Sequence, residues 1–361
     1  CGLNTNTYRE NLNNSSRPSL PNNLETLRFK IHYDANFTSY NFALFIGITA
    51  ENSLDMLLSR GWMSPPPDDN RGGNNKYDIY LTDTYSRHKA AGATFSEMPV
   101  EYYYPDSYAS FIEIINDTNK ISFPLNNISK KEFIKYLVLH ELVHASQFAY
   151  SNSEEEAFYE NSAVFVSKQF YPQVDLLPLY FRIYNISNSL MHPFYDINHF
   201  DRYGYQYTGS LWCIFLSEYY RDTNIILNIW QHLAITEGNN YWDVLREFLP
   251  DYKDALTKYA IWRYFTGERF NQKFFREGYK WPTSSIGKIH SSYPDSGSIT
   301  SMTLLAVNEA LNGPGGTYYI RFENGFGSFN IDFQGKQGIE YKVIVIEIKN
   351  PDLVGDTINF N

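Results

Sequence analysis

Two periods of apolar and polar residues alternate along the chain, and together they predict a mixed α+β fold. A period of two marks Leu27–Tyr33, and short apolar runs at Tyr77–Leu81 and Phe111–Ile115 indicate buried strands. Helical spacing of apolar residues predicts a helix over Phe42–Arg60. The stretch Ser64–Asn75 is rich in Pro, Gly, Asn and Asp, which is typical of a loop.

The remainder of the chain divides into a helical part and a strand-rich part. Helical spacing recurs through residues 176–280, whereas three stretches between residues 317 and 348 alternate as strands between Gly and Asn turns. The segment 1–24 is rich in Asn and Ser and is predicted to be a flexible tether. We therefore expect one large domain over residues 25–284 and a small β-sandwich over residues 285–361.

One predicted helix carries the strongest chemical pattern. In VLHELVHASQFAY, Val138–Tyr150, the order His-Glu-x-x-His places His140 and His144 one turn apart on one helix face, where both can bind a single metal ion. Glu141 is rotated roughly 100° from His140 and lies beside such an ion, where a general base belongs. A helix with two ordinary histidines is the alternative, so the interpretation needs a third ligand.

The helix expected next along the chain offers that ligand. Glu160 lies among apolar neighbours, where a carboxylate is costly unless a cation compensates it, so Glu160 is predicted as the third ligand, with Glu156 as the next candidate. Glu154–Glu156 is predicted to be a solvated helix start, with Ser153 as N-cap and Glu156 closing a capping box. Gln147 is either an outer hydrogen-bonding partner of the metal site or a polar cap of the helix end.

The two motifs, HELVHASQFAY and FYENSAVF, resemble a family of secreted bacterial zinc metalloproteases that carry H-E-x-x-H-x-x-Q and then an aromatic-x-E-G-T-A segment. Softer similarity extends over residues 26–283, through FKIHY, GWMSPPPDDNRGGNNKYDIYLTD and YAIWRYFTGERF. The chain has E-N-S-A in place of E-G-T-A, but Asn161 and Ser162 are small and polar, so Glu160 is kept as the ligand. The resemblance implies a zincin-like domain over residues 25–284, with a twisted sheet on the motif helix and an edge strand to which a substrate peptide can add.

The resemblance also implies a residue that stabilises the oxyanion of the substrate. In zincins a Tyr or His of the helical subdomain often has this role, and RYGYQYTGS offers Tyr203, Tyr205 and Tyr207. Tyr207 is taken as the catalytic candidate, although the sequence does not choose among the three. Three further histidines have no partner at ligand spacing and are predicted to be ordinary: His192, His199 and His232.

Composition and the two cysteines indicate which partners the protein binds and where in the cell it is located. The net charge of −10, without a basic stripe, argues against nucleic acid, and no apolar stretch approaches the length of a membrane span. Cys1 is typical of a processed bacterial lipoprotein and predicts membrane attachment through a lipidated cysteine, outside the cytoplasm; an artificial chain end is the alternative. Cys213 is predicted to be a buried thiol.

Two stretches between the predicted strands leave alternatives open. Asp68, Asp69 and Asn70 offer oxygen ligands of the kind that Ca²⁺ binds, but their spacing fits no strong calcium motif, which favours a solvated loop. The tyrosines of EYYYPDSY either line a substrate groove or form a partly exposed aromatic cluster.

The sequence therefore predicts a zinc metalloendopeptidase that acts on a protein or peptide substrate. Zinc is held by His140, His144 and Glu160, and Glu141 is the general base. One rival is a non-catalytic, surface-anchored binding protein on the same scaffold, which is disfavoured because structural zinc usually has four ligands and no fourth is apparent. The other rival is a zinc hydrolase of a non-peptide amide. The oligomeric state and the substrate are left open.

Overall fold

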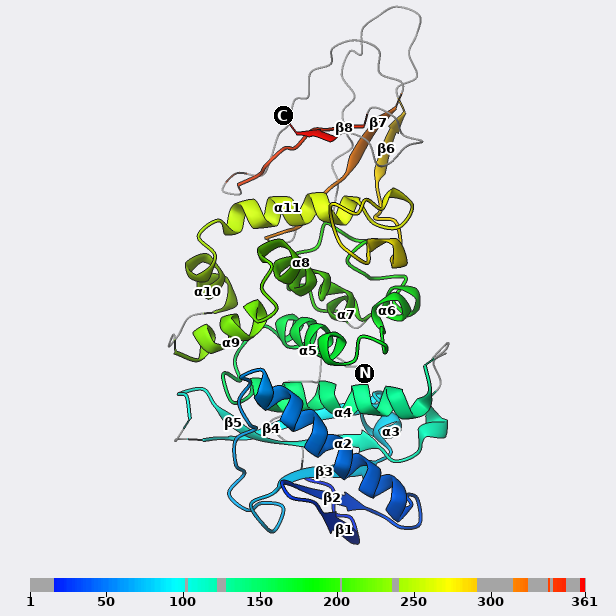
Figure 1. The fold of residues 1–361 in the computed structure, drawn as a ribbon, viewed down its shortest axis with the longest axis vertical. Coiled ribbons are helices and arrows are strands. Elements are labelled where there is room, and N and C mark those ends of the chain that lie inside the picture. Colours follow the sequence, from blue (N-terminus) through cyan, green and yellow to red (C-terminus); the bar gives the residue numbers. More distant parts are fainter. Residues whose placement is uncertain are drawn as a thin grey trace, which may run out of the picture. The chain divides into compact units, whose positions relative to one another are not determined.

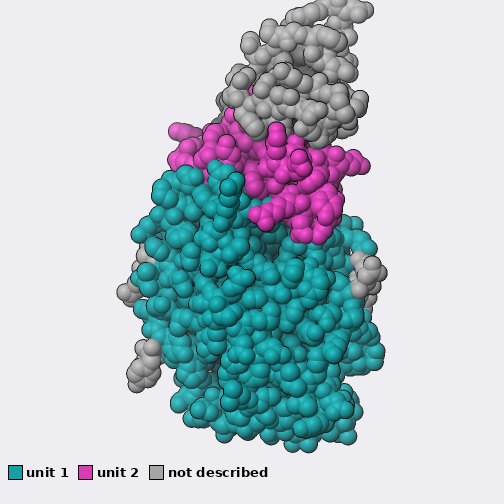
Figure 2. Space-filling model, viewed as in Figure 1, with its two compact units in different colours: residues 1–187, 198–252 teal, residues 188–197, 253–361 magenta. Residues whose placement is uncertain are grey.

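The computed structural model describes residues 16–100, 103–121, 128–201, 203–235, 240–290, 314–323, 337, 340–348 and 358–360. The chain groups into two compact units, coloured separately in Figure 2: residues 1–187 with 198–252, and residues 188–197 with 253–361. The predicted domain boundary after residue 284 stays a prediction. The α+β class is confirmed, since helices and a mixed sheet both occur in the first unit.

The first unit is built on a five-stranded mixed sheet in the order β1-β2-β3-β5-β4. Three central strands run parallel, while β1 and β4 pair antiparallel at the two edges. The sequence predicted β2, β3 and β5 but neither edge strand. The bounds are β1 (Asn22–Glu25), β2 (Phe29–Tyr33), β3 (Tyr77–Thr82), β4 (Gly92–Pro99) and β5 (Tyr108–Ile115).

Two long helices lie side by side on one face of this sheet, α2 (Tyr40–Ser59) and α4 (Lys130–Gln147), as Figure 1 shows. Each begins at a serine N-cap whose side chain accepts a backbone N–H, Ser39 for α2 and Ser129 for α4. Helix α2 packs on β2, and α4 packs on β4 and β5. The motif helix is therefore fixed directly against the edge strand.

Helix α2 corrects one expectation from the sequence. It is long and apolar enough, by length and composition alone, to cross a membrane. The statement that no stretch approaches a membrane span is wrong on these criteria. In the fold, Ala43, Ile46, Ala50 and Leu54 are buried, and α2 packs against both α4 and β2. Packing in the core accounts for the apolar residues of this helix.

Helices α5 to α10 lie beyond α4, whereas α3 packs on β4 and β5 (Figure 1). Helix α5 packs against α4, α7 and α8, which brings the second motif onto the first (Figure 1). Cys213 on α8 is fully buried and free, as predicted. The bounds are α3 (Thr84–His88), η1 (Thr118–Lys120), α5 (Glu156–Phe170), α6 (Leu177–Ile183), α7 (Tyr205–Gly209), α8 (Leu211–Tyr220), α9 (Ile225–Ile235) and α10 (Tyr241–Phe248).

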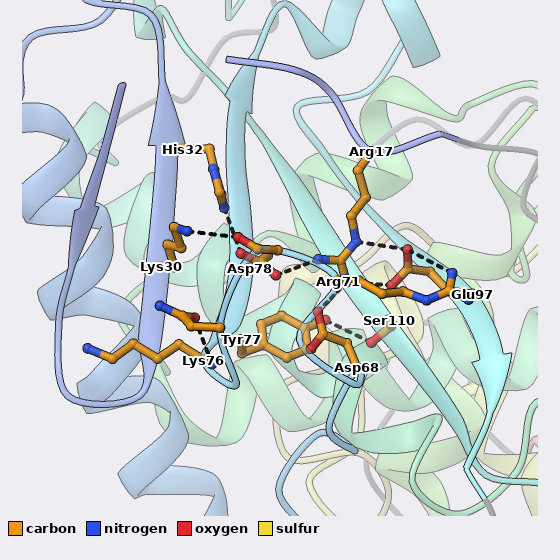
Figure 3. A network of polar contacts seen from close by, with 12 residues as sticks. Arg17, Lys30, His32, Asp68, Arg71, Lys76, Tyr77, Asp78, Glu97 and Ser110 are labelled. Carbon is orange, nitrogen blue, oxygen red and sulfur yellow. Dashed lines mark hydrogen bonds and ion pairs between the residues drawn. The ribbon is translucent and has the colours of Figure 1, made fainter. Parts of the chain in front are cut away.

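The predicted tether over residues 1–24 is wrong for its described part. Asn22–Glu25 forms the edge strand β1, and Leu20 packs against a cluster on the sheet that includes Phe111. Arg17 inserts its guanidinium among carboxylates of the same face, between Asp78 and Glu97 in Figure 3. Ion pairs and apolar contacts over a long sequence separation hold this segment, and its Asn- and Ser-rich composition did not reveal them. Residues 1–15, Cys1 included, lie outside the described residues.

The second unit contains α11 from its second residue onward and short paired strands. Ile261, Tyr264 and Phe265 of this region form a core cluster, against which Ile286 and Tyr319 pack. Strands β6 and β7 pair in parallel, and β8 and β9 pair antiparallel. The predicted β-sandwich stays a prediction, because much of residues 285–361 lies outside the described part. The bounds are α11 (Tyr252–Tyr264), η2 (Gly267–Arg269), η3 (Gly278–Lys280), β6 (Gly287–His290), β7 (Ile320–Glu323), β8 (Ile346–Ile348) and β9 (Ile358–Phe360).

Candidate metal centre

Three predicted ligands converge at the contact of α4 with α5. His140 and His144 lie one turn apart on α4, and Glu160 faces them from α5. One ligand atom of each side chain lies within 4.8 Å of the other two, and all three residues are buried. Among the described residues this is the group of His, Cys, Asp or Glu side chains that is arranged to hold a metal ion.

The spacing of the three ligand atoms matches a tetrahedral site. His140 Nε2 and His144 Nε2 are 3.1 Å apart, and Glu160 oxygens lie 3.3 Å from His140 Nε2 and 3.6 Å from His144 Nε2. Ligands held about 2.0–2.1 Å from a tetrahedral zinc ion are separated by roughly 3.3–3.4 Å. The three ligand atoms therefore lie close enough together to share one metal ion.

The electrostatics of the group favour the charged form of Glu160. Burial by itself lowers the pKa of His144, but the charge of Glu160 outweighs burial and raises that pKa to about 8. Burial likewise raises the pKa of Glu160, yet His144 and then His140 outweigh it and hold the pKa at about 2. The buried carboxylate is thus strongly stabilised in its charged form, the form in which it binds a metal.

Gln147 fixes which nitrogen of His144 faces the centre. Its amide nitrogen lies 3.1 Å from the carbonyl oxygen of Tyr159 and 2.8 Å from Ser162 Oγ. A carbonyl only accepts, so the amide oxygen of Gln147 must face His144 Nδ1, 2.8 Å away. In the neutral imidazole, Nδ1 therefore carries the hydrogen and Nε2 presents its lone pair to the centre. Of the two roles predicted for Gln147, the contact with His144 Nδ1 agrees with the outer hydrogen-bonding partner, and its part in a metal site stays a prediction.

Glu141 lies beside the three ligands and is held by the sheet. The hydroxyl of Thr94 on β4 is 2.8 Å from Glu141 Oε2 and 3.0 Å from its main-chain oxygen. Gly92, two residues earlier on the same strand, leaves room for the carboxylate, since an added Cβ there would be 2.7 Å from Oε1. The carboxylate is 2% exposed, which separates it from bulk solvent.

Tyr207 stands out from the other two tyrosine candidates. Tyr203 is 41% exposed, and the ring of Tyr205 packs on His199. Tyr207 is buried, and burial, followed by the charge of Glu160, raises its pKa well above the usual value. Its hydroxyl therefore stays neutral, and it has no hydrogen-bond partner within the described part of the chain. It is a free donor close to the charges of Glu160 and Glu141.

The start of α5 corrects the predicted capping. The helix begins at Glu156 with Glu155 as N-cap and no side-chain cap, so the Ser153 capping box is wrong. The hydroxyl and N–H of Ser153 instead donate to Asp106, which competes with a cap. Glu154 is buried rather than solvated, and Glu156 is not part of the three-ligand group.

Other predicted residues lie away from the centre. Asp68 pairs with Arg17 at 2.6 Å and is buried, and Asp69 and Asn70 adopt left-handed backbone. No grouping that includes these residues is arranged for Ca²⁺ in the described ranges. His199 and His232 lie near carboxylates of Asp201 and Glu247, and His192 contacts aromatic rings. Tyr104 stacks on Tyr150, while Tyr102 lies outside the described residues.

The sequence reasoning missed Thr94 and Gly92 because it missed β4. The strand begins with small residues, Gly92 and Ala93, and has a bulge between Ser96 and Met98, so it lacks the apolar run that marks β5. The period-two alternation of residues 92–95 could have revealed the strand. Ala93 and Phe95 face the apolar cluster that includes Phe111, whereas Gly92 and Thr94 face α4.

No protein-family profile and no curated protein matches the chain.

Proposed function

We propose that the protein is a zinc-dependent metallopeptidase and that His140, His144 and Glu160 hold the zinc ion. The observation that carries the proposal is the convergence of two imidazole nitrogens and a buried carboxylate at tetrahedral spacing, with a second carboxylate directly beside them. Three protein ligands leave the fourth position of zinc open, as catalytic sites require. A zinc ion in such a site activates water and polarises a carbonyl group.

The surrounding side chains supply the remaining chemistry. Glu141 accepts a proton from the attacking water and later delivers it to the nitrogen of the leaving amine. Tyr207, neutral and without a hydrogen-bond partner in the described part, donates its hydroxyl to the oxyanion that develops on the substrate. Gln147 keeps the His144 ring in the orientation that presents Nε2.

The arrangement of the first unit supports a zincin-like domain. The motif helix α4 packs on a twisted mixed sheet, an antiparallel strand forms the nearest edge, and the helix carrying the third ligand packs on α4. The strand β4 has one edge without a strand partner in the described sheet, to which a peptide substrate can add. Secretion is kept as a proposal that rests on the resemblance of the motifs.

Zinc content and peptide cleavage, measured together, test the proposal. We expect one zinc per chain in the wild type and in Glu141→Ala, and cleavage of casein or a peptide library by the wild type alone. Glu132→Ala is the matched control, because Glu132 lies on the same helix and pairs with Lys135 at the surface. It is expected to keep both zinc and cleavage.

Three other outcomes separate the rivals. Absence of zinc from the wild type contradicts the metal centre itself. Zinc in both proteins with no cleavage of peptides, but hydrolysis of cell-wall amides, identifies a non-peptide amide hydrolase. Zinc with neither activity favours a binding protein.

A further inference from the structure

We propose that Thr94 is the positioning residue for Glu141, and that Gly92 and Thr94 together make the edge strand β4 the support of the general base. The inference rests on the proposed function, in which Glu141 is the general base. It assigns a role to the sheet that neither the sequence motif nor the three ligands contain.

The side chain of Thr94 is directed at Glu141. Thr94 is fully buried, and its hydroxyl is within hydrogen-bond distance of two oxygens of one residue, Glu141 Oε2 at 2.8 Å and the Glu141 main-chain oxygen at 3.0 Å. A hydroxyl has a single hydrogen, so it serves one of these acceptors at a time. Both acceptors belong to Glu141, so either choice keeps the threonine engaged with that residue.

Gly92 confines the carboxylate from the other side. A Cβ at position 92 would be 2.7 Å from Glu141 Oε1 and 3.0 Å from its Cγ, so any larger residue displaces this side chain. Gly92 does not require a left-handed backbone, since it is not among the glycines with positive φ. Glycine is therefore required at position 92 because a side chain there would occupy the space of Glu141.

The register of β4 couples these two contacts. Gly92 pairs with Ile114 and Thr94 with Ile112 on the central strand β5, so both residues face α4 at fixed positions along the strand. On the opposite face, Phe95 stacks on Phe111 at 5.1 Å. A buried aromatic contact thus locks the rotation of the strand that aims the Thr94 hydroxyl at Glu141.

A carboxylate that must receive a proton works only when it is held in place. A misplacement of about 1 Å in a catalytic group costs on the order of 100-fold in rate. Thr94 supplies a hydrogen bond to one oxygen of Glu141, and the absence of a side chain at Gly92 sets the position of the other. The contact predicts an effect on kcat rather than on zinc binding, because the Thr94 hydroxyl meets Glu141, which is not one of the three predicted ligands.

The experiment compares Thr94→Val, Thr94→Ser and Gly92→Ala with Ser96→Ala, a buried position on the same strand and the same face. We expect Thr94→Val and Gly92→Ala to lose about 10–100-fold in kcat, with KM and zinc content close to wild type. Thr94→Ser keeps the hydroxyl and is expected to restore kcat to within a few-fold. Ser96→Ala is expected to leave all three quantities unchanged.

A second measurement does not depend on activity. In a double-mutant cycle, Thr94→Val should lower the urea midpoint of the wild type clearly more than that of Glu141→Ala, because the contact is already absent there. Equal shifts in both backgrounds overturn the proposal, as do wild-type kcat in Thr94→Val or a failure of Thr94→Ser to restore it. If the wild type cleaves no peptide, the proposed function fails, and the cycle alone decides whether Thr94 positions Glu141.

Discussion

Two clusters of buried charged side chains lie on opposite faces of the same sheet, and their carboxylates are compensated in different ways. On the α4 face, His140, His144 and Glu160 converge on one another, and the charge of Glu160 raises the pKa of His144 to about 8. On the opposite face, three carboxylates surround the guanidinium of Arg17, as Figure 3 shows. A buried carboxylate needs a compensating charge or a proton. We therefore compare the two clusters by what compensates their carboxylates: a candidate ligand set can use a metal ion, whereas a structural cluster uses charges of the chain itself.

The Arg17 network is compensated from within the chain. Arg17 lies 2.6 Å from Asp68 and 2.5 Å from both Asp78 and Glu97, and its contact with Glu97 uses two nitrogens. Burial raises the pKa of Asp78, but the hydrogen bond from His32 and then the charge of Arg17 outweigh it and lower that pKa. This cluster ties the N-terminal segment to the sheet through ion pairs that the chain itself supplies.

The buried carboxylate of Glu154 is a third case, in which a proton neutralises the charge. Burial raises the pKa of Glu154 to about 7, against the hydrogen bond from Ser151, and the nearby charge of Asp106 adds to the rise. Glu154 is thus compensated by a proton, the carboxylates around Arg17 by a guanidinium, and we propose that the α4 centre is compensated by a metal ion. The three cases turn the comparison into measurable differences.

The largest expected effect is on the α4 centre. Glu160→Gln keeps the size of the side chain but removes the charge, so zinc affinity should fall by more than the 10–100-fold typical of losing an outer partner. Competition with a chelator at fixed pH measures this. Glu155→Gln, an exposed neighbour on the same segment, is the matched control and should bind zinc as the wild type does. Unchanged affinity in Glu160→Gln would show that Glu160 is not a ligand.

The Arg17 network should respond in stability rather than in metal binding. Arg17→Ala leaves three carboxylates facing one another, and removal of one partner of a buried ion pair costs about 3–5 kcal/mol of unfolding free energy. Urea unfolding measures it, with Arg28→Ala as the control. Arg28 pairs with Glu51 nearer the surface, so its loss should cost about 0–1 kcal/mol. Equal costs, or loss of zinc in Arg17→Ala, would contradict the division between scaffold and site.

Glu154 should make stability depend on pH. The folded protein keeps this proton up to about pH 7, whereas the unfolded chain releases it near the ordinary value of 4.5. This group therefore costs stability progressively as pH rises from 4.5 to 7, by about 3 kcal/mol at most. Glu154→Gln should remove the cost, so its unfolding free energy relative to wild type should rise between pH 4.5 and pH 8. A constant difference across that range would rule out the raised pKa.

The smallest effect is expected at Gln147. Gln147→Ala removes the acceptor of His144 Nδ1, so zinc affinity should fall about 10–100-fold while the ligands stay in place. Chelator competition again provides the measurement. Gln169→Ala is the control, because Gln169 donates to the main-chain oxygen of the exposed Thr223, in the connection between α8 and α9. A loss as large as that of Glu160→Gln would mean that Gln147 does more than orient the ring.

Local patterns predicted most of the elements that carry the candidate site. The helical spacing around His140 and His144 predicted α4, and the apolar surroundings of Glu160 predicted its position inside α5. Predictions failed where contacts distant in sequence replace local ones. Asp106 takes the hydrogen bonds that would have let Ser153 cap α5, and ion pairs of Arg17 order a segment whose composition suggests a tether.

By itself, the sequence determined the chemistry offered by the chain: the spacing of His140 and His144, the carboxylate of Glu141 directly after His140, and Glu160 as the candidate third ligand. Helical periodicity is a local property, so short-range spacing is enough to read it. Only the tertiary structure decided that Thr94 reaches Glu141 across 47 positions. It also brought Tyr207 close to Glu160, and Arg17 onto the far face of the sheet. These contacts depend on strand register and helix packing, which no local pattern encodes.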